Sequence, residues 1–104
     1  MREAALHGLT QAPGAEAEAL LSHHLTSKAP VAERALALEA LARRVADPAG
    51  LVRGYRGSDE VALRRGLILG LGARDDAAGR SALESLARQD PDEGLRKLAG
   101  DQLH

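Results

Sequence analysis

The sequence predicts an all-α fold, a right-handed solenoid built from antiparallel helical hairpins, and three observations lead to this prediction. The chain is 44% hydrophobic but only 1% aromatic, and its apolar side chains are mainly Ala, Leu and Val. Small side chains suit closely packed helices better than sheets, which favour β-branched and aromatic residues. The second observation is a string that recurs along the chain, and the third is a turn signal after each copy.

The recurring string starts with arginine and continues with small and aliphatic residues. Its four copies read REAALHGL, RALALEAL, RRGLILGL and RKLAGDQL, and they start at Arg2, Arg34, Arg64 and Arg96. The residues three and seven places after the arginine are small or aliphatic in every copy: Ala5, Ala37, Leu67 and Ala99, then Leu9, Leu41, Leu71 and Leu103. Positions three, four and seven apart share one face of a helix. Each string therefore predicts a helix with one apolar face.

A second apolar segment follows the strings, after turn residues, in QAPGAEAEALLSHHL, ADPAGLVRGY and RDDAAGRSALESLA. Each period is therefore a helical hairpin. At the junction RQDPDEGLRKLA we expect Asp90 to be the N-cap and Pro91 to take the first helical position, with Asp92 and Glu93 favoured by the helix dipole.

Stacking of these hairpins predicts one domain over residues 1–104, with approximate repeats at 1–29, 30–58 and 59–89 and a partial repeat at 90–104. A single hairpin cannot bury both its faces, so neighbouring hairpins must pack on one another. This explains glycines inside an apolar helix expected from about residue 59 to 72. We predict that Gly66 and Gly70 let a neighbouring backbone approach, and that Gly72 forms a C-terminal cap.

The segment DEVALRRGLILGLGARDDAAGRSALESLARQDPDEGLRKLAGDQL resembles the short HEAT-like repeats first named from phycobiliprotein lyases. In that pattern an Arg-containing helix ends in Leu-Gly and is followed by Asp, a short loop and a second Leu-rich helix. The resemblance covers nearly the whole chain, although AGLVRGYRG is short for a helix and the last repeat lacks its second helix. It implies an α-solenoid of about three and a half repeats that acts as a binding or scaffolding module.

Charge and composition limit the partners. The formal net charge is −1, so general attraction to nucleic acid or anionic lipid is not expected. The chain has no cysteine, which excludes a disulfide framework and thiolate metal sites. The longest apolar run, GLILGLGA, is too short to span a bilayer, and the first residues lack the apolar core of a signal peptide. We therefore expect a soluble, cytoplasmic protein without a membrane partner.

The middle of the chain, residues 31–65, holds seven arginines against five acidic residues and is the predicted partner-binding region. The predicted partner-binding residues are Arg44, Arg53, Tyr55, Arg56 and Arg65, and Arg43 and Arg64 lie beside them. Exposed Tyr and Arg are enriched at interface hot spots. Glycines at 50, 54 and 57 would leave the short segment exposed. The alternative is that Tyr55 fills a groove while the arginines are solvated or pair with Asp47, Asp59 and Glu60.

These features favour a non-enzymatic protein–protein interaction or scaffolding function. One alternative is binding of a phosphate backbone through the basic cluster Arg43–Arg65, for which a single tyrosine offers few stacking surfaces. A second alternative, an accessory subunit of a lyase-like complex, rests on the resemblance alone. The final helix, from about 91 to 103, carries Leu95, Leu98 and Leu103. This stripe either packs back on the preceding hairpin or mediates self-association with another copy.

Catalytic and metal motifs are absent from the sequence. The four histidines, His7, His23, His24 and His104, do not form a His-Glu-x-x-His signature, and we expect no metal or cofactor. No serine lies in a Gly-x-Ser-x-Gly elbow, and the glycines form no phosphate-binding loop. We therefore expect no enzymatic activity.

Overall fold

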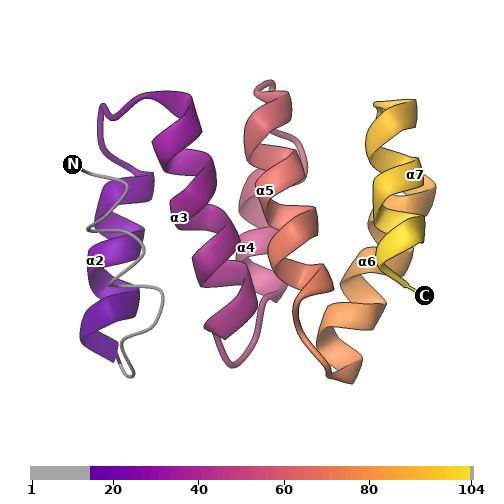
Figure 1. The fold of residues 1–104 in the computed structure, drawn as a ribbon, viewed down its shortest axis with the longest axis horizontal. Coiled ribbons are helices and arrows are strands. Elements are labelled where there is room, and N and C mark those ends of the chain that lie inside the picture. The colour runs from indigo at the N-terminus through magenta and orange to yellow at the C-terminus, as the bar shows by residue number, and fades with distance from the viewer. Residues whose placement is uncertain (1–14, 104) are drawn as a thin grey trace.

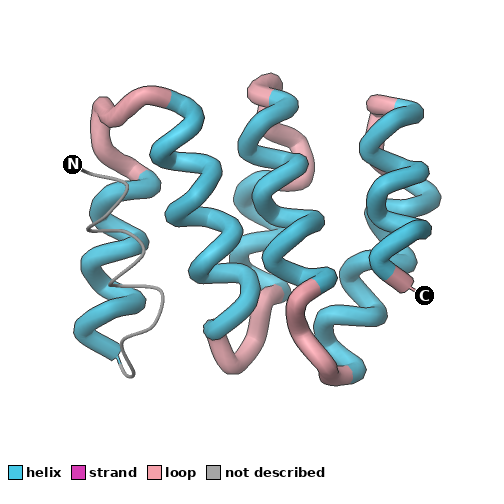
Figure 2. The backbone as a smooth tube through the Cα atoms, viewed as in Figure 1, coloured by secondary structure: helices cyan, strands magenta, loops and turns pink. Residues whose placement is uncertain are grey.

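The computed structural model describes residues 15–103, and this part of the chain is all-helical (Figure 1). The helices are α2 (Ala15–Leu25), α3 (Val31–Arg44), α4 (Ala49–Tyr55), α5 (Val61–Gly72), α6 (Ala77–Gln89) and α7 (Glu93–Gln102). Short loops join them at alternating ends (Figure 2). The string starting at Arg2, together with His7 and His104, lies outside the described residues.

The helices form two layers. α3, α5 and α7 lie side by side and run in the same direction, and α4 and α6 lie behind them and run the opposite way (Figure 1). α5 packs against both α3 and α7, while α4 contacts α6 in the second layer. α2 packs against α3, and α6 packs against α7. The described helices thus form three antiparallel hairpins, which are α2 with α3, α4 with α5 and α6 with α7.

The three described strings form the three helices of the first layer, as predicted. Ala37, Leu67 and Ala99, three residues after each arginine, are fully buried. The leucines four residues later follow the same face, because Leu41 and Leu71 are also buried. Leu103 follows the last turn of α7 and is half-buried against the core. The apolar stripe read from the sequence is therefore the buried face of each helix.

The prediction for Gly66 and Gly70 is confirmed, because both lie where α5 meets the backbone of α3. A Cβ on Gly66 would lie 2.6 Å from the carbonyl oxygen of Ala35. A Cβ on Gly70 would overlap the carbonyl oxygen of Glu39 and the methyl group of Ala42. Only hydrogen in place of a side chain allows the two helices to approach this closely.

The prediction for Gly72 is wrong. Gly72 is the last residue of α5, the capping residue is Ala73, and Gly72 does not have the left-handed backbone conformation of a glycine cap. A Cβ on Gly72 would collide with the side chain of Gln102 on α7. The neighbour at Gly72 is therefore a flexible side chain, whereas Gly66 and Gly70 face the backbone of α3.

The expected N-cap of the last helix is also wrong. Asp92 caps α7, since its carboxylate accepts a hydrogen bond from the backbone N–H of Leu95 at 3.1 Å. Asp90 instead ends α6 and is buried, with one carboxylate oxygen accepting from the backbone N–H of Asp92 at 2.9 Å. The Asp-Pro-Asp sequence offers two possible N-cap residues, and the carboxylate of the first, Asp90, also accepts a hydrogen bond from Arg64.

The leucines of α7 pack back on the preceding hairpin. Leu95 is 5% exposed, and Leu98 and Leu103 are half-buried against the core. Glu93, Lys97 and Asp101 are the exposed side chains of α7. The surface that α7 leaves free is therefore polar.

Candidate functional site

Two of the arginines that start the recurring string, Arg34 and Arg64, connect neighbouring hairpins through ion pairs. Arg34 pairs with Glu60, with Nη2 3.0 Å from Oε2, and Arg64 pairs with Asp90, with Nε 3.2 Å from Oδ2. Both pairs span 26 residues, so the same bond occurs in successive repeats. The spacing of 26 residues between the arginine and its acidic partner could have been found in the sequence, but a count of charges over residues 31–65 does not show it.

The same arginines also donate hydrogen bonds to the loop before their own helix. Arg34 donates to the carbonyl oxygen of Ala29 at 2.9 Å, and Arg64 donates to that of Ser58. Arg96, the third member, donates to the carbonyl oxygen of Asp90 at 2.7 Å. Arg34, Arg64 and Arg96 therefore each bind the loop that precedes a helix of the first layer.

Burial separates the two ion pairs. The side chains of Arg64 and Asp90 are 8% and 0% exposed, whereas those of Arg34 and Glu60 are 22% and 43% exposed. Arg64, which the sequence places in the basic cluster, is thus enclosed within the protein. Glu60 pairs with Arg34 and not with one of the predicted partner-binding arginines.

Arg74, in the loop after α5, makes further bonds between neighbouring hairpins, and no pattern in the sequence was assigned to it. Its guanidinium donates to the carbonyl oxygens of Ala42, Val45 and Ala46 and to the carboxylate of Asp76. The bond from Arg74, together with the backbone N–H of Gly79, lowers the pKa of Asp76, the N-cap of α6. Arg44 occupies the position 30 residues earlier, which is the offset between Arg34 and Arg64, and is half-buried. The repeat pattern thus indicates a structural place for Arg44 also.

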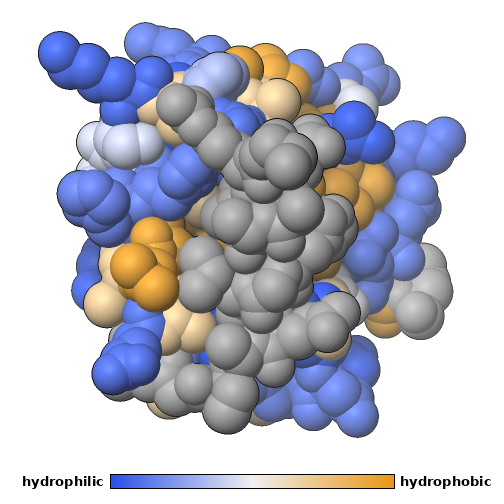
Figure 3. Space-filling model, turned by 60° about the vertical axis from the view of Figure 1, so that its left-hand side comes forward, coloured by the Kyte–Doolittle hydropathy of each residue, from blue (hydrophilic) through white to orange (hydrophobic). Residues whose placement is uncertain are grey.

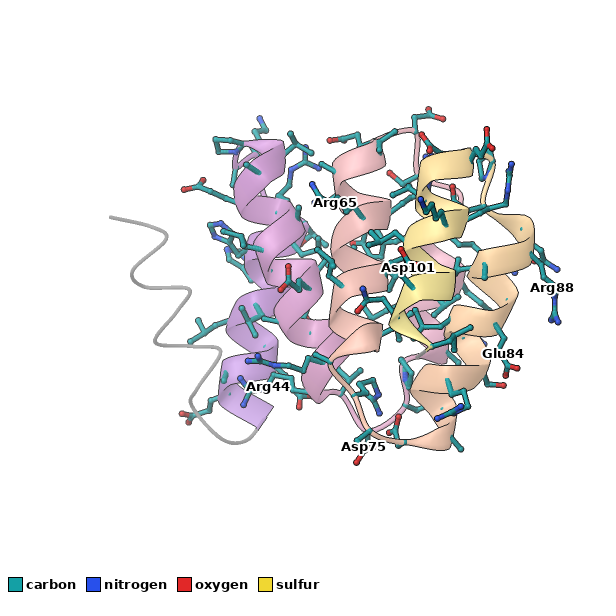
Figure 4. The ribbon with its side chains drawn as sticks, turned by 45° about the vertical axis from the view of Figure 1, so that its right-hand side comes forward. Arg44, Arg65, Asp75, Glu84, Arg88 and Asp101 are labelled. Atoms are coloured by element: carbon teal, nitrogen blue, oxygen red, sulfur yellow. The ribbon has the colours of Figure 1, made fainter. Side chains whose placement is uncertain are left out.

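The predicted partner-binding residues do not form one cluster. Arg53 and Arg56 are exposed on and just after α4, and the space beyond Gly50, Gly54 and Gly57 is open, as expected. Arg65 is exposed on α5 in the other layer. Figure 4 shows Arg65 and Arg44 near opposite ends of the first layer. The hairpin geometry therefore distributes these five residues over different surfaces.

Tyr55 is half-buried and packs against the core. Burial raises the pKa of its hydroxyl above the ordinary value of 10.0, and the nearby positive charge of Arg34 opposes this effect. The neutral phenol is therefore favoured in the folded state. Its contribution to stability is complete below the unfolded pKa and is lost as the pH rises through the folded pKa.

We expect the ultraviolet difference spectrum of the folded protein to titrate with a midpoint above 10.0, and that of the urea-unfolded protein to titrate near the ordinary value. Tyr55 is the only aromatic residue of the chain, so the signal reports one group. Tyr55→Phe should lessen the loss of stability above the unfolded pKa. Equal midpoints in the folded and unfolded protein would contradict the observed burial.

An apolar groove lies between α3 and α5. It encloses about 380 Å³ and is lined by Ala32, Ala35, Leu36, Glu39, Val61, Ala62, Arg65, Gly66 and Leu69. Val61 is 46% exposed, one of two large hydrophobic side chains exposed within residues 15–103. Arg65 and Glu39 are the charged lining residues, and within the described part of the chain neither forms an ion pair. Arg65 is the one lining residue that belongs to the predicted partner-binding residues.

A second hollow of about 350 Å³ lies between α4 and α6. It is lined by Asp47, Pro48, Ala49, Val52, Arg53, Ala78, Ser81 and Ala82. Asp47 is partly engaged, because its carboxylate accepts a hydrogen bond from the backbone N–H of Ala49 at 3.0 Å. The two hollows lie on different layers, and each has one of the predicted arginines in its lining.

Figure 3 shows hydrophobic side chains at several places among hydrophilic ones on the visible part of the α2 end. Within residues 15–103, no three His, Cys, Asp or Glu side chains are grouped to hold a metal ion. None of the helices described is long and apolar enough to cross a membrane.

Comparison with known proteins adds no relative. The chain matches no protein-family model, and no curated protein or solved structure matches it at a significant level.

Proposed function

We propose that the chain is a non-enzymatic protein-binding module, a short solenoid of HEAT-like hairpins that binds a partner protein in the α3–α5 groove. Two features support the solenoid arrangement. α3, α5 and α7 lie side by side in one direction, and equivalent arginines make equivalent bonds 26 residues ahead in two successive repeats. Stacked hairpins of this kind present continuous surfaces to macromolecules.

The observation that carries the binding proposal is the composition of the groove. Its floor is made of Ala, Leu, Val and Gly, and its lining contains two charges of opposite sign, Arg65 and Glu39, which form no ion pair within residues 15–103. An apolar centre with polar groups around it is the usual make-up of a protein interface. Val61, Ala62 and Ala32 are exposed here, so a partner would remove apolar surface from water.

Nucleic-acid binding is less well supported. Arg34, Arg64 and Arg74 already bond to acidic side chains and backbone carbonyls within the protein. Phosphate binding requires cations that face one backbone together, and Arg53, Arg56 and Arg65 lie on two layers. An accessory role in a lyase-like complex is one form that the proposed protein binding would take.

The test is affinity capture from nuclease-treated lysate with four forms of the protein: wild type, Arg65→Glu, Arg56→Glu and Arg88→Glu. Arg65 lies in the groove, Arg56 follows α4, and Arg88 is an exposed residue of α6 that points away from Arg65 (Figure 4). We expect a protein that is retained by wild type, Arg56→Glu and Arg88→Glu but lost with Arg65→Glu.

Loss with Arg56→Glu and retention with Arg65→Glu would move the binding surface to α4. Identical retention by all four forms would contradict a docking role for either arginine. Material that is captured only when nuclease is omitted would favour the nucleic-acid alternative.

A further inference from the structure

We propose that the partner presents an α-helix to the α3–α5 groove and that this helix carries an acidic and a basic side chain four residues apart, facing Arg65 and Glu39. The inference rests on the proposed protein-binding function and adds the chemistry of the partner. Three features of the groove lead to it: the lack of hydrogen-bonding side chains other than Arg65 and Glu39, the small residues of its floor and the offset of its two charges.

The groove favours a helix over an extended peptide. Apart from Arg65 and Glu39, its lining side chains are Ala, Leu, Val and Gly, which offer no hydrogen bonds. An extended segment would bury backbone N–H and C=O groups against this floor without partners, which is costly. A helix satisfies its own backbone groups internally and can lie on an apolar surface.

Small residues allow the helix to approach closely. Ala32, Ala35 and Ala62 line the groove together with Gly66, which has no side chain. Packed helices lie about 8 to 10 Å apart, and the shorter distances require small residues at the contact. The exposed side chains of Val61 and Ala62, at the start of α5, offer further apolar contacts to the partner.

The two charges have a defined offset along the groove. Gly66 lies against Ala35 and Gly70 lies against Glu39, so α3 and α5 are aligned in this register. Arg65, next to Gly66, is therefore about one helical turn from the level of Glu39. One turn is about 5.4 Å, or nearly four residues of a docked helix. A carboxylate facing Arg65 would thus place a basic side chain four residues away beside Glu39.

Electrostatic complementarity of this kind selects among partners. A helix that docks in the same direction with the opposite charge order would place like charges together at both positions. Because Arg65 and Glu39 are unpaired in the described part of the chain, pairing with a partner would break no existing ion pair. The charge pair therefore sets the register of the helix, and the apolar floor supplies the buried area.

The first experiment places the photoreactive residue benzoylphenylalanine at Ala62, in the groove, and in a control protein at Ala78, in the α4–α6 hollow. Both positions are exposed, so the substitution should leave the fold intact, which circular dichroism will verify. After irradiation in cells, the cross-linked peptide is sequenced by mass spectrometry. We expect a cross-link from Ala62 to a helical segment with an acid and a base four residues apart.

The second experiment uses a synthetic peptide of the cross-linked segment and the charge-swapped protein Arg65→Glu, Glu39→Arg. The swap should weaken binding at least about tenfold, because both charge pairs become repulsive. A peptide in which the acid and the base are exchanged should recover this loss. The control swap Glu84→Arg, Arg88→Glu on α6 should leave the affinity unchanged.

The outcomes distinguish the two proposals. A cross-link from Ala78 but none from Ala62, or none from either, would overturn the groove as the docking site and the inference with it. A cross-link from Ala62 to a non-helical segment, or to a helix without the charge pair, would overturn the inference and leave the docking function standing. Equal affinity of the swapped and wild-type proteins for the peptide would do the same.

Discussion

Replacing Asp90 by alanine should lower the free energy of unfolding by about 3 to 5 kcal/mol, the usual effect of removing one partner of a buried ion pair. The side chains of Arg64 and Asp90 are 8% and 0% exposed, so the remaining guanidinium would be buried without its counter-charge. Asp90 also accepts the backbone N–H of Asp92 at 2.9 Å, and this bond would be lost. Urea denaturation followed by far-ultraviolet circular dichroism measures the change.

The equivalent pair one repeat earlier provides the control. Glu60→Ala breaks the bond to Arg34, but these side chains are 43% and 22% exposed, so we expect a loss of at most about 1 kcal/mol. If Asp90→Ala does not fold, the double variant Arg64→Met, Asp90→Leu, which removes both charges, should recover most of the stability. Equal effects of Asp90→Ala and Glu60→Ala would contradict the difference in burial.

Gly70→Ala should destabilise the protein by about 1 to 3 kcal/mol, as over-packing of a well-packed site commonly does. The sign is informative, because alanine is favoured over glycine within a helix by about 1 kcal/mol. The added Cβ would overlap the carbonyl oxygen of Glu39 and the methyl group of Ala42. Gly70→Leu should be more damaging still, and urea denaturation measures both.

Gly54→Ala is the matched control, since Gly54 lies within α4 and a Cβ there would meet nothing within 4 Å. It should stabilise the protein by about 0.5 to 1 kcal/mol through helix propensity alone. Stabilisation by Gly70→Ala as well would show that α3 and α5 do not approach as closely as the structure has them.

The buried faces of the helices could be predicted from the sequence because they depend on local spacing. The arginine strings locate α3, α5 and α7, and the residues three and seven places later are those that the structure buries or half-buries. The caps were less predictable. Asp90 and Asp92 are equivalent candidates in sequence, and the choice depends on Arg64, which lies 26 residues away.

The candidate site depends on contacts that local spacing does not show. Arg64 and Arg65 are adjacent in sequence, but successive side chains on a helix point about 100° apart. One is therefore buried against Asp90 while the other faces the groove. Gly66, which lines the groove, and Gly70 both lie against the backbone of α3. Sequence spacing predicted that close approach but not the hollow that it leaves beside Arg65.

The proposed docking of a partner between α3 and α5 is tested by chemical-shift mapping of the isotope-labelled protein by nuclear magnetic resonance, with the captured partner segment added. We expect shifts concentrated at Ala32–Glu39 and Val61–Leu69, with little change at Ala78–Ala82. Shifts concentrated on α4 and α6, with the α3–α5 groove unchanged, would contradict the proposed docking.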